Sequence, residues 1–520
     1  TRILDTPLTK QFSDQDLQEE IEDIEDAFGI SYDAVQKNAI KEALQSKVFI
    51  LTGGPGTGKT TVINGLIAAY ADLHGIDLEK KDIPIVLAAP TGRAARRMNE
   101  LTGLPSATIH RHLGLNGDND YQAMDDYLDC DLIIIDEFSM VDTWLANQLF
   151  SSISSNTQVI IVGDSDQLPS VGPGQVLADL LKIKTLPQIA LTKIFRQSED
   201  STIVTLANQM RQGILPADFT QKKADRSYFE AGAQYIPEMI PKIVSAAIKS
   251  GISPQEIQIL APMYRGAAGI NRLNTIIQDL LNPLGDQLSF AFGDMNFRKG
   301  DKVLHLINDA ELNVFNGDIG YITDLIPAKY TESKQDELYM SFDGTEVIYP
   351  RNEWHKITLA YAMSIHKSQG SEFQVVILPI TSQSRRLLQR NLIYTAITRS
   401  KSKLVMLGEI AAFDYAIKNE GSKRKTYLVQ RFTTNPEDLD NSETIENPDE
   451  AKESQNEPDK ATSSAHVEEE KSEKVIQLSL DFNEDKPDNV KEYRLTEENL
   501  PFIDPMIGIT KEDIEQFFKK

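Results

Sequence analysis

Cysteine is almost absent from this sequence. Cys130 is the only cysteine among 520 residues, so no disulfide bond can form within the chain. Such low usage fits the reducing conditions of the cytoplasm, where we expect the protein to be. Because Cys130 lies beside the apolar run Leu132–Ile135, a buried and inert thiol is favoured over a nucleophile.

Long apolar segments are also missing. Runs such as Val159–Val162 and Val375–Leu378 fall far short of the roughly 20 apolar residues that a membrane-spanning helix needs. The chain begins at Thr1 without a basic segment followed by an apolar one, so we expect no signal peptide. A first residue other than methionine suggests a fragment of a longer protein.

Positive charge is in deficit. The 53 Lys and Arg against 78 Asp and Glu give a net charge of −25, which at first argues against a nucleic-acid partner. Residues 431–520 alone hold 11 Lys and Arg against 25 Asp and Glu, a net charge of −14. A narrow basic track on the rest of the chain is compatible with this distribution, so bulk charge does not exclude nucleic acid.

Short apolar runs alternate with helical patterns up to about residue 433, which predicts buried parallel strands with crossover helices. A first series is Val48–Thr52, Ile85–Ala89, Leu132–Ile135 and Val159–Val162, and a second is Ile257–Leu260, Ile357–Tyr361, Val375–Leu378 and Lys403–Met406. Within the second series, short strands separated by Asn-Gly and Asp-Gly turns predict a small inserted β-barrel. We therefore expect an α/β protein with two consecutive parallel-sheet domains.

These patterns give approximate domain boundaries. The predicted parts are an N-terminal helical remnant (1–30), a first α/β domain (31–187), a second α/β domain (188–296 and 353–433), the inserted barrel (297–352), a disordered acidic linker (434–474) and a C-terminal tail (475–520). The linker is predicted to be disordered because it has almost no large apolar residues to bury.

A complete phosphate-loop motif, Gly53–Thr60, follows the first predicted strand and opens a helix. Its glycines let backbone N–H groups surround a phosphate, and the helix N-terminus adds a positive dipole end. Lys59 is expected to reach the β- and γ-phosphates of ATP, and the Thr60 hydroxyl to coordinate Mg²⁺. The residues expected to contact the nucleotide here are Gly54, Pro55, Gly56, Thr57, Gly58, Lys59, Thr60 and Thr61.

Two carboxylates follow the apolar run Leu132–Ile135 directly. Ligands bind at the carboxyl ends of strands in open parallel sheets, which is where Asp136 and Glu137 emerge. We expect Asp136 to bind Mg²⁺ and Glu137 to polarise the water that attacks the γ-phosphate. Together with the phosphate loop, this pair indicates ATP hydrolysis.

Further motifs occur in order along the α/β region and resemble those of the RecD/TraA family of superfamily-one DNA helicases. They are Tyr32–Gln36, Pro90–Ala95, Thr108–Arg111, Gly163–Pro169, Phe195–Gln197, Ala261–Gly266, Val314–Asp318, Ala362–Glu372 and Tyr394–Arg399. The resemblance implies two RecA-like domains around ATP. It also implies that Gln36 binds the adenine edge and that Gln167 senses the γ-phosphate.

Arginines of the second domain are expected to complete the ATP site. Arg196 and Arg399 belong to that domain, whereas the phosphate loop belongs to the first, so bound nucleotide would be clamped from both sides. Losing the γ-phosphate would let the domains part. This movement becomes a step along a strand if each domain also holds DNA.

Hydroxyl and basic side chains in the motifs are suited to sequence-independent contacts with DNA phosphates. The candidates are Thr91, Arg93 and His110 in the first domain and Ser364, His366, Lys367 and Ser368 in the second. Without the family resemblance, Arg93, Arg96 and Arg97 would be interpreted as a solvated helix face. His110 and His112 could suggest zinc, but the sequence offers no Cys or carboxylate set to complete such a site.

Two insertions carry hypotheses of their own. In the family a β-hairpin before the Asp-Glu strand acts as a strand-separating pin, and residues 114–129, with a turn near Gly117, are the candidate here. Near the C-terminus, Gln477–Phe482 is similar to peptides that dock on the bacterial sliding clamp, with Gln477, Leu478, Leu480 and Phe482 as anchors. A short strand packed back onto the protein is the alternative for this peptide.

Two classes of function remain open from the sequence. The first is a monomeric helicase that moves 5′ to 3′ on single-stranded DNA, as the resemblance implies, and unwinds duplex junctions in repair or recombination. The second is an ATP-switched protein that grips single-stranded nucleic acid without unwinding. A nuclease is disfavoured because no second carboxylate cluster is visible outside the ATP site. RNA stays open as a substrate.

Overall fold

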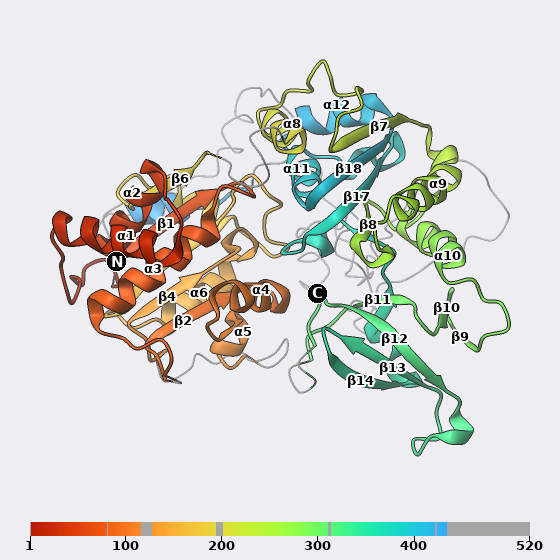
Figure 1. Cartoon of the computed structure of the whole chain (residues 1–520), viewed down its shortest axis with the longest axis horizontal. Coiled ribbons are helices and arrows are strands. Elements are labelled where there is room, and N and C mark those ends of the chain that lie inside the picture. Colours follow the sequence, from red (N-terminus) through yellow and green to blue (C-terminus); the bar gives the residue numbers. More distant parts are fainter. Residues whose placement is uncertain are drawn as a thin grey trace, which may run out of the picture. The chain divides into compact units, whose positions relative to one another are not determined.

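The computed structural model describes residues 2–80, 82–115, 127–193, 201–309, 312, 314–421 and 424–433. Two parallel sheets, a five-stranded antiparallel sheet and a two-stranded antiparallel hairpin organise this part of the chain (Figure 1). The predicted pin and clamp-docking peptide lie outside these residues, except for the flanks of the pin at 114–115 and 127–129. Within the described residues, no helix is long and apolar enough to cross a bilayer.

The first domain is built on a six-stranded parallel sheet with strand order β3-β2-β4-β5-β1-β6. Its strands are β1 (Val48–Gly53), β2 (Ile85–Ala89), β3 (Ser106–Thr108), β4 (Leu132–Ile135), β5 (Gln158–Gly163) and β6 (Gln188–Leu191). Its helices are α2 (Ala34–Gln45), α3 (Lys59–His74), α4 (Gly92–Thr102), α5 (Ile109–His112), α6 (Thr143–Ser152) and α7 (Val176–Leu180). The four predicted strands are present, and β4 and β5 are buried along their whole length.

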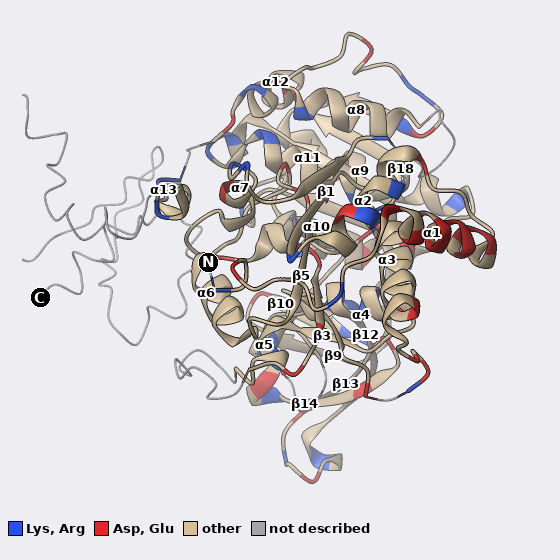
Figure 2. Cartoon of the chain, turned by 90° about the vertical axis from the view of Figure 1, so that its left-hand side faces the viewer, with Lys and Arg blue, Asp and Glu red and all other residues tan. Residues whose placement is uncertain are grey.

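The predicted limits of the first domain, 31 and 187, need correction at both ends. Strand β6 pairs in parallel with β1, so the sheet extends beyond residue 187. Helix α1 (Asp14–Phe28) begins at a Ser13 capping box and buries Leu17, Ile21 and Ile24 in the same core as β1 and β4. Its opposite face is acidic (Figure 2). Residues 14–28 are therefore part of the first domain and not a separate remnant.

The second domain is built on a five-stranded parallel sheet with strand order β16-β8-β17-β18-β7. Its strands are β7 (Arg226–Glu230), β8 (Ile257–Ala261), β16 (Ala362–Ser364), β17 (Phe373–Ile380) and β18 (Ser400–Gly408). Its helices are α8 (Thr202–Arg211), α9 (Ile236–Lys249), α10 (Ile270–Leu281), α11 (Arg390–Thr398) and α12 (Ile410–Lys418). The predicted α/β class is thus confirmed for both domains.

The insertion forms a five-stranded antiparallel sheet with strand order β14-β13-β12-β11-β15. Its strands are β11 (Lys302–His305), β12 (Ile319–Ile326), β13 (Glu337–Phe342), β14 (Thr345–Pro350) and β15 (Ile357–Leu359), and the hairpin β9 (Ser289–Phe292) and β10 (Met295–Arg298) precedes them. Ile357–Tyr361 was predicted to be a strand of the second domain. This assignment was wrong, because β15 pairs antiparallel with β11 of the insertion. The insertion consequently extends past the predicted limit of 352.

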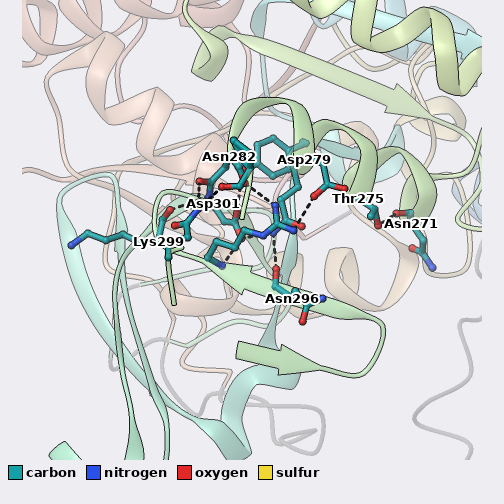
Figure 3. A network of polar contacts seen from close by, with 12 residues as sticks. Asn271, Thr275, Asp279, Asn282, Asn296, Lys299 and Asp301 are labelled. Carbon is teal, nitrogen blue, oxygen red and sulfur yellow. Dashed lines mark hydrogen bonds and ion pairs between the residues drawn. The ribbon is translucent and has the colours of Figure 1, made fainter. Parts of the chain in front are cut away.

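A buried carboxylate joins α10 to the inserted sheet (Figure 3). The fully buried Asp301 carboxylate accepts hydrogen bonds from Gln278 Nε2 at 2.6 Å, Asn282 Nδ2 at 2.8 Å and Tyr361 Oη at 2.9 Å. Burial raises the pKa of Asp301, and these donors act in the opposite direction. The network fixes the start of β11 against the second domain.

The chain returns to the first domain after α12. Helix α13 (Leu428–Thr433) packs near α7, and Leu428, Val429 and Phe432 contact the core beneath β4 and β5. The predicted second-domain range of 353–433 therefore ends with a segment that belongs to the first domain by its contacts.

Candidate nucleotide site between the two parallel-sheet domains

The phosphate loop connects β1 to α3 as predicted. Gly56 and Gly58 adopt φ angles of 78° and 85°, a conformation that only glycine adopts without strain. Lys59 Nζ donates to the carbonyl oxygens of Gly53 at 2.7 Å and Gly54 at 3.2 Å, so the ammonium group lies across the loop. The Thr60 side chain, at the first turn of α3, is half-buried.

Asp136 and Glu137 follow β4 at the same edge of the sheet. Glu137 has φ 52°, an unusual left-handed conformation for a non-glycine residue that redirects the chain directly after the strand. Burial raises the pKa of both carboxyls, and the Asp136 charge raises that of Glu137 further. Lys59 and Arg97 act on both groups in the opposite direction. Opposite charges from the loop and from α4 therefore surround the carboxylate pair.

This donor set fits a nucleotide with Mg²⁺. Hydroxyl and carboxylate oxygens, as on Thr60 and Asp136, are the ligands that Mg²⁺ prefers. A Cβ atom on Gly54 would lie 2.9 Å from Tyr394 Oη of the second domain, so the loop leaves no room for a side chain there. The close approach of backbone amides to a phosphate needs this absence of side chains.

Arg399 reaches from the second domain to the first. Its Nη2 donates to Gln167 Oε1 at 2.9 Å, while its Nη1 and Nε donate to the carbonyl oxygens of Ser371 at 3.1 Å and Thr395 at 3.2 Å. Burial lowers the pKa of this guanidinium, and the nearby Glu137 charge raises it. The predicted phosphate sensor and the predicted arginine finger are thus in direct contact.

Three further hydrogen bonds join the segment around Gln167 to the second domain. Tyr394 Oη donates to Asp164 Oδ2 at 3.0 Å, and the Leu168 backbone N–H donates to Thr395 Oγ1 at 2.9 Å. Gln369 Nε2 donates to the Leu168 carbonyl oxygen at 3.1 Å. The Gly163–Pro169 motif is therefore held by two different motifs of the second domain, Ala362–Glu372 and Tyr394–Arg399.

A pocket opens beside the phosphate loop between the two domains. It is lined by Gly54, Pro55, Thr57, Leu191, Thr192, Ile203, Val204, Ala207, Asn208, Arg211, Tyr394, Thr398 and Ser400. Arg211, on α8, also forms an ion pair with Asp166 at 3.2 Å. Arg211 could not be predicted as a site residue from the sequence, because its helix carries no motif and the contact joins residues 45 positions apart.

Of the predicted site residues Gln36 and Arg196, the structure describes only Gln36. Gln36 is buried, and its Nε2 donates to the Thr57 carbonyl oxygen at 3.4 Å, so it lies against the phosphate loop. Its predicted contact with adenine stays a prediction. Arg196 lies outside the described residues, and so does its predicted contact with the γ-phosphate.

The first-domain DNA-contact candidates Thr91 and Arg93, at the start of α4, lie against the second-domain segment that follows Ser368. The Thr91 hydroxyl caps α4 by accepting from the Ala94 N–H, and a Cβ on Gly370 would lie 3.5 Å from that hydroxyl. The Arg93 guanidinium stacks over the Phe373 ring, 5.5 Å from its centre. Lys367 Nζ donates to Asn316 Oδ1 at 2.7 Å on an exposed surface.

The remaining candidates differ in accessibility. His110 and His366 are half-buried, and burial lowers the pKa of His110. Ser364 is buried and accepts a hydrogen bond from the Lys367 N–H. Ser368 is fully buried and donates its hydroxyl to the Ile365 carbonyl oxygen at 2.7 Å. The structure thus corrects the prediction for Ser368, which shapes the turn and has no surface available to DNA in this arrangement.

The arginines of α4 do not form a solvated face. Arg97 pairs with Glu372 at 2.8 Å, and Arg96 pairs with Asp318 and, at 3.4 Å, with Asp343. Both side chains therefore hold the first domain against the second domain and its insertion. Their partners lie more than 200 residues away along the chain, so no local sequence pattern indicates these ion pairs.

Comparison with known proteins identifies the family. Residues 36–173 match an AAA domain, residues 273–342 the SH3 domain of ATP-dependent RecD-like DNA helicases, and residues 359–407 the UvrD-like helicase C-terminal domain. The RecBCD enzyme subunit RecD of Mycolicibacterium smegmatis is 31% identical over 444 residues, which cover 79% of this chain and 77% of the relative. The chain belongs to the RecD family of superfamily-one helicases.

A second relative of this RecD-family chain is a longer protein. The ATP-dependent RecD2 DNA helicase of Deinococcus radiodurans is 32% identical over 397 residues, covering 76% of the chain and 52% of the relative. The chain thus spans about half the length of that protein. A solved structure of two coordinating Pif1 helicases at forked double-stranded DNA aligns with a TM-score of 0.47 and 21% identity, covering 78% of this chain and 96% of that one.

Proposed function

We propose that this RecD-family chain is an ATP-dependent DNA helicase that translocates on single-stranded DNA and unwinds duplexes at single-strand junctions, in repair or recombination. The contact between Arg399 of the second domain and Gln167 of the first, beside the phosphate loop, carries the proposal. A site shared in this way lets ATP chemistry change how the two domains meet.

Each side chain of the site has a defined task in this proposal. Lys59 and the loop amides bind the phosphates, and Glu137 accepts a proton from the attacking water. Thr60 and Asp136 would hold Mg²⁺, which neutralises charge on the phosphates. Arg399 and Arg196 would stabilise charge on the γ-phosphoryl oxygens from the second domain.

Loss of the γ-phosphate removes the anion that both domains share. We propose that the domains then separate and that each keeps a grip on the strand, through Thr91, Arg93 and His110 on one side and Ser364, His366 and Lys367 on the other. These contacts to phosphates carry no sequence information, as a translocating motor requires. The 5′ to 3′ direction is proposed from the family resemblance.

The proposed helicase acts as a monomer in the cytoplasm.

We also propose that Gln477–Phe482, outside the described residues, docks on the bacterial sliding clamp. A labelled 474–484 peptide is expected to show increased fluorescence anisotropy when the clamp is added. An unchanged anisotropy at a clamp concentration of about 1 mM, which equals the Kd of a very weak complex, would contradict this proposal.

The proposed function is tested by ATP hydrolysis with and without single-stranded DNA. We expect DNA to stimulate hydrolysis in the parent, and Lys59→Ala to lower kcat by about 10²- to 10³-fold because it removes a charged phosphate ligand. Lys249→Ala, an exposed lysine at the end of α9, is the matched control and should behave like the parent.

Strand displacement separates the two candidate functions. A helicase should release the short strand of a 5′-tailed duplex only with ATP, and a 3′-tailed duplex should stay intact. DNA-stimulated hydrolysis without displacement of either duplex would instead establish an ATP-switched binding protein.

A further inference from the structure

One guanidinium in the segment after the second domain is held by the first domain. Arg424 Nη2 donates to the Ser170 carbonyl oxygen at 2.7 Å. Its Nη1 donates to the carbonyl oxygens of Gly172 at 2.7 Å and Gly174 at 2.6 Å and to Ser170 Oγ at 3.3 Å. All four acceptors belong to residues 170–174, which we name the sensor loop because it follows Gln167.

The sensor loop continues the segment that the second domain contacts. Gln167 accepts from Arg399, and Leu168 is held through its N–H by Thr395 and through its carbonyl oxygen by Gln369. Only Pro169 separates Leu168 from the loop. The path of the loop backbone therefore determines where the Gln167 side chain can reach.

The other side of the sensor loop packs against the start of α6. The Thr143 N–H donates to the Pro173 carbonyl oxygen at 2.9 Å. A Cβ on Gly172 would lie 1.9 Å from Asp142 Oδ2, and one on Gly174 the same distance from Thr143 Oγ1. The loop is thus confined between α6, which follows the carboxylate pair along the chain, and the Arg424 guanidinium.

Arg424 binds the loop through neutral carbonyl groups. Burial lowers its pKa, and the nearby Asp142 charge raises it. One planar fork thus binds three backbone carbonyls of the loop, of which that of Gly172 also accepts from the Ser170 hydroxyl at 3.1 Å. A lysine carries the same charge on a single nitrogen and cannot reproduce this geometry.

Residues before and after Arg424 in the chain form hydrogen bonds with different domains. Asn419 accepts from the Arg390 N–H at 2.8 Å, at the start of the helix that carries Tyr394 and Thr395 and leads to Arg399. Thr426 Oγ1 donates to the buried Asp179 at 2.5 Å in the first domain. Arg424 therefore lies between two anchored residues. Asn419 is bonded to the first residue of α11, the helix that leads to Arg399, and Thr426 is bonded to the first domain.

We propose that Arg424 is a positioning residue for ATP hydrolysis, which holds the sensor loop so that Gln167 meets Arg399 when the domains close. This inference rests on the proposed function, in which Gln167 and Arg399 act on the γ-phosphate. Arg424 itself does not touch the nucleotide in this account.

The test compares steady-state hydrolysis by Arg424→Ala, Arg424→Lys and Lys425→Ala with single-stranded DNA present. Displacement of a backbone near the reacting groups should lower kcat of Arg424→Ala about 10- to 100-fold. The KM for ATP should stay within about twofold, because the phosphate loop is unchanged. Arg424→Lys should be intermediate, and Lys425→Ala, the exposed neighbour, should match the parent.

A double-mutant cycle with Arg399→Ala separates positioning from general stability. In that background, Arg424→Ala should change kcat less than about twofold, because the contact it supports is already lost. Equal losses in both backgrounds, or a kcat of Arg424→Ala equal to that of the parent, would overturn the inference. A parent without DNA-stimulated hydrolysis would instead defeat the proposed function, and the inference with it.

Discussion

Arg399→Ala is expected to lower kcat for ATP hydrolysis by about 10³-fold or more, the effect of removing an arginine finger. The arginine supplies the positive charge that the second domain directs toward the site, and the transition state carries more γ-phosphoryl charge than the ground state. The KM for ATP should change little, because the phosphate loop belongs to the first domain. Steady-state kinetics and fluorescent-nucleotide binding measure the two effects separately.

Conservative and control variants sharpen this prediction. Arg399→Lys keeps the charge but cannot donate to Gln167, Ser371 and Thr395 together, so most of the loss should persist. Arg386→Ala removes an exposed arginine of the same domain and should leave kcat unchanged. Near-parental kcat in Arg399→Ala would show that hydrolysis needs no arginine at this position.

Glu137→Gln is expected to reduce kcat by about 10²- to 10⁴-fold while nucleotide binding persists, as loss of a general base requires. The amide preserves the size of the side chain but cannot accept a proton from water. Burial and the Asp136 charge raise the pKa of Glu137, which makes the carboxylate a stronger base than an exposed one. Single-turnover hydrolysis measures the chemical step directly.

Glu79→Gln, an exposed glutamate outside the site, is the control for this substitution. It should hydrolyse ATP at the parental rate. A Glu137→Gln variant with an unchanged single-turnover rate would assign the base to another group.

Central strands and the phosphate loop could be predicted because their sequences satisfy local physical requirements. Strand β4 and the Val159–Val162 part of β5 are buried on both faces and therefore consist of uninterrupted apolar residues. The edge strands β6 and β7 were missed because each is short and partly exposed, and β7 in addition begins and ends with charged residues. Strand β15 was assigned to the wrong sheet because an apolar run does not encode its partner strand.

Contacts between the domains could not be predicted for a related reason. Judged by sequence alone, Arg97 and Arg424 would be expected to be exposed. Their roles depend on contacts with residues that the fold brings close to them. Arg399 was found only because its motif resembles that of a known family. For Ser368 the family motif led to a predicted contact with DNA, but a position in a motif does not indicate whether the side chain is buried.

The most direct test of the account is a structure of the chain with a non-hydrolysable ATP analogue, Mg²⁺ and single-stranded DNA. We predict that the phosphate loop holds the triphosphate and that the Arg399 guanidinium lies within about 3 Å of a γ-phosphate oxygen, the distance of a charge-assisted hydrogen bond. A γ-phosphate contacted by the first domain alone, with Arg399 still donating to Gln167 and Ser371, would contradict the proposed mechanism.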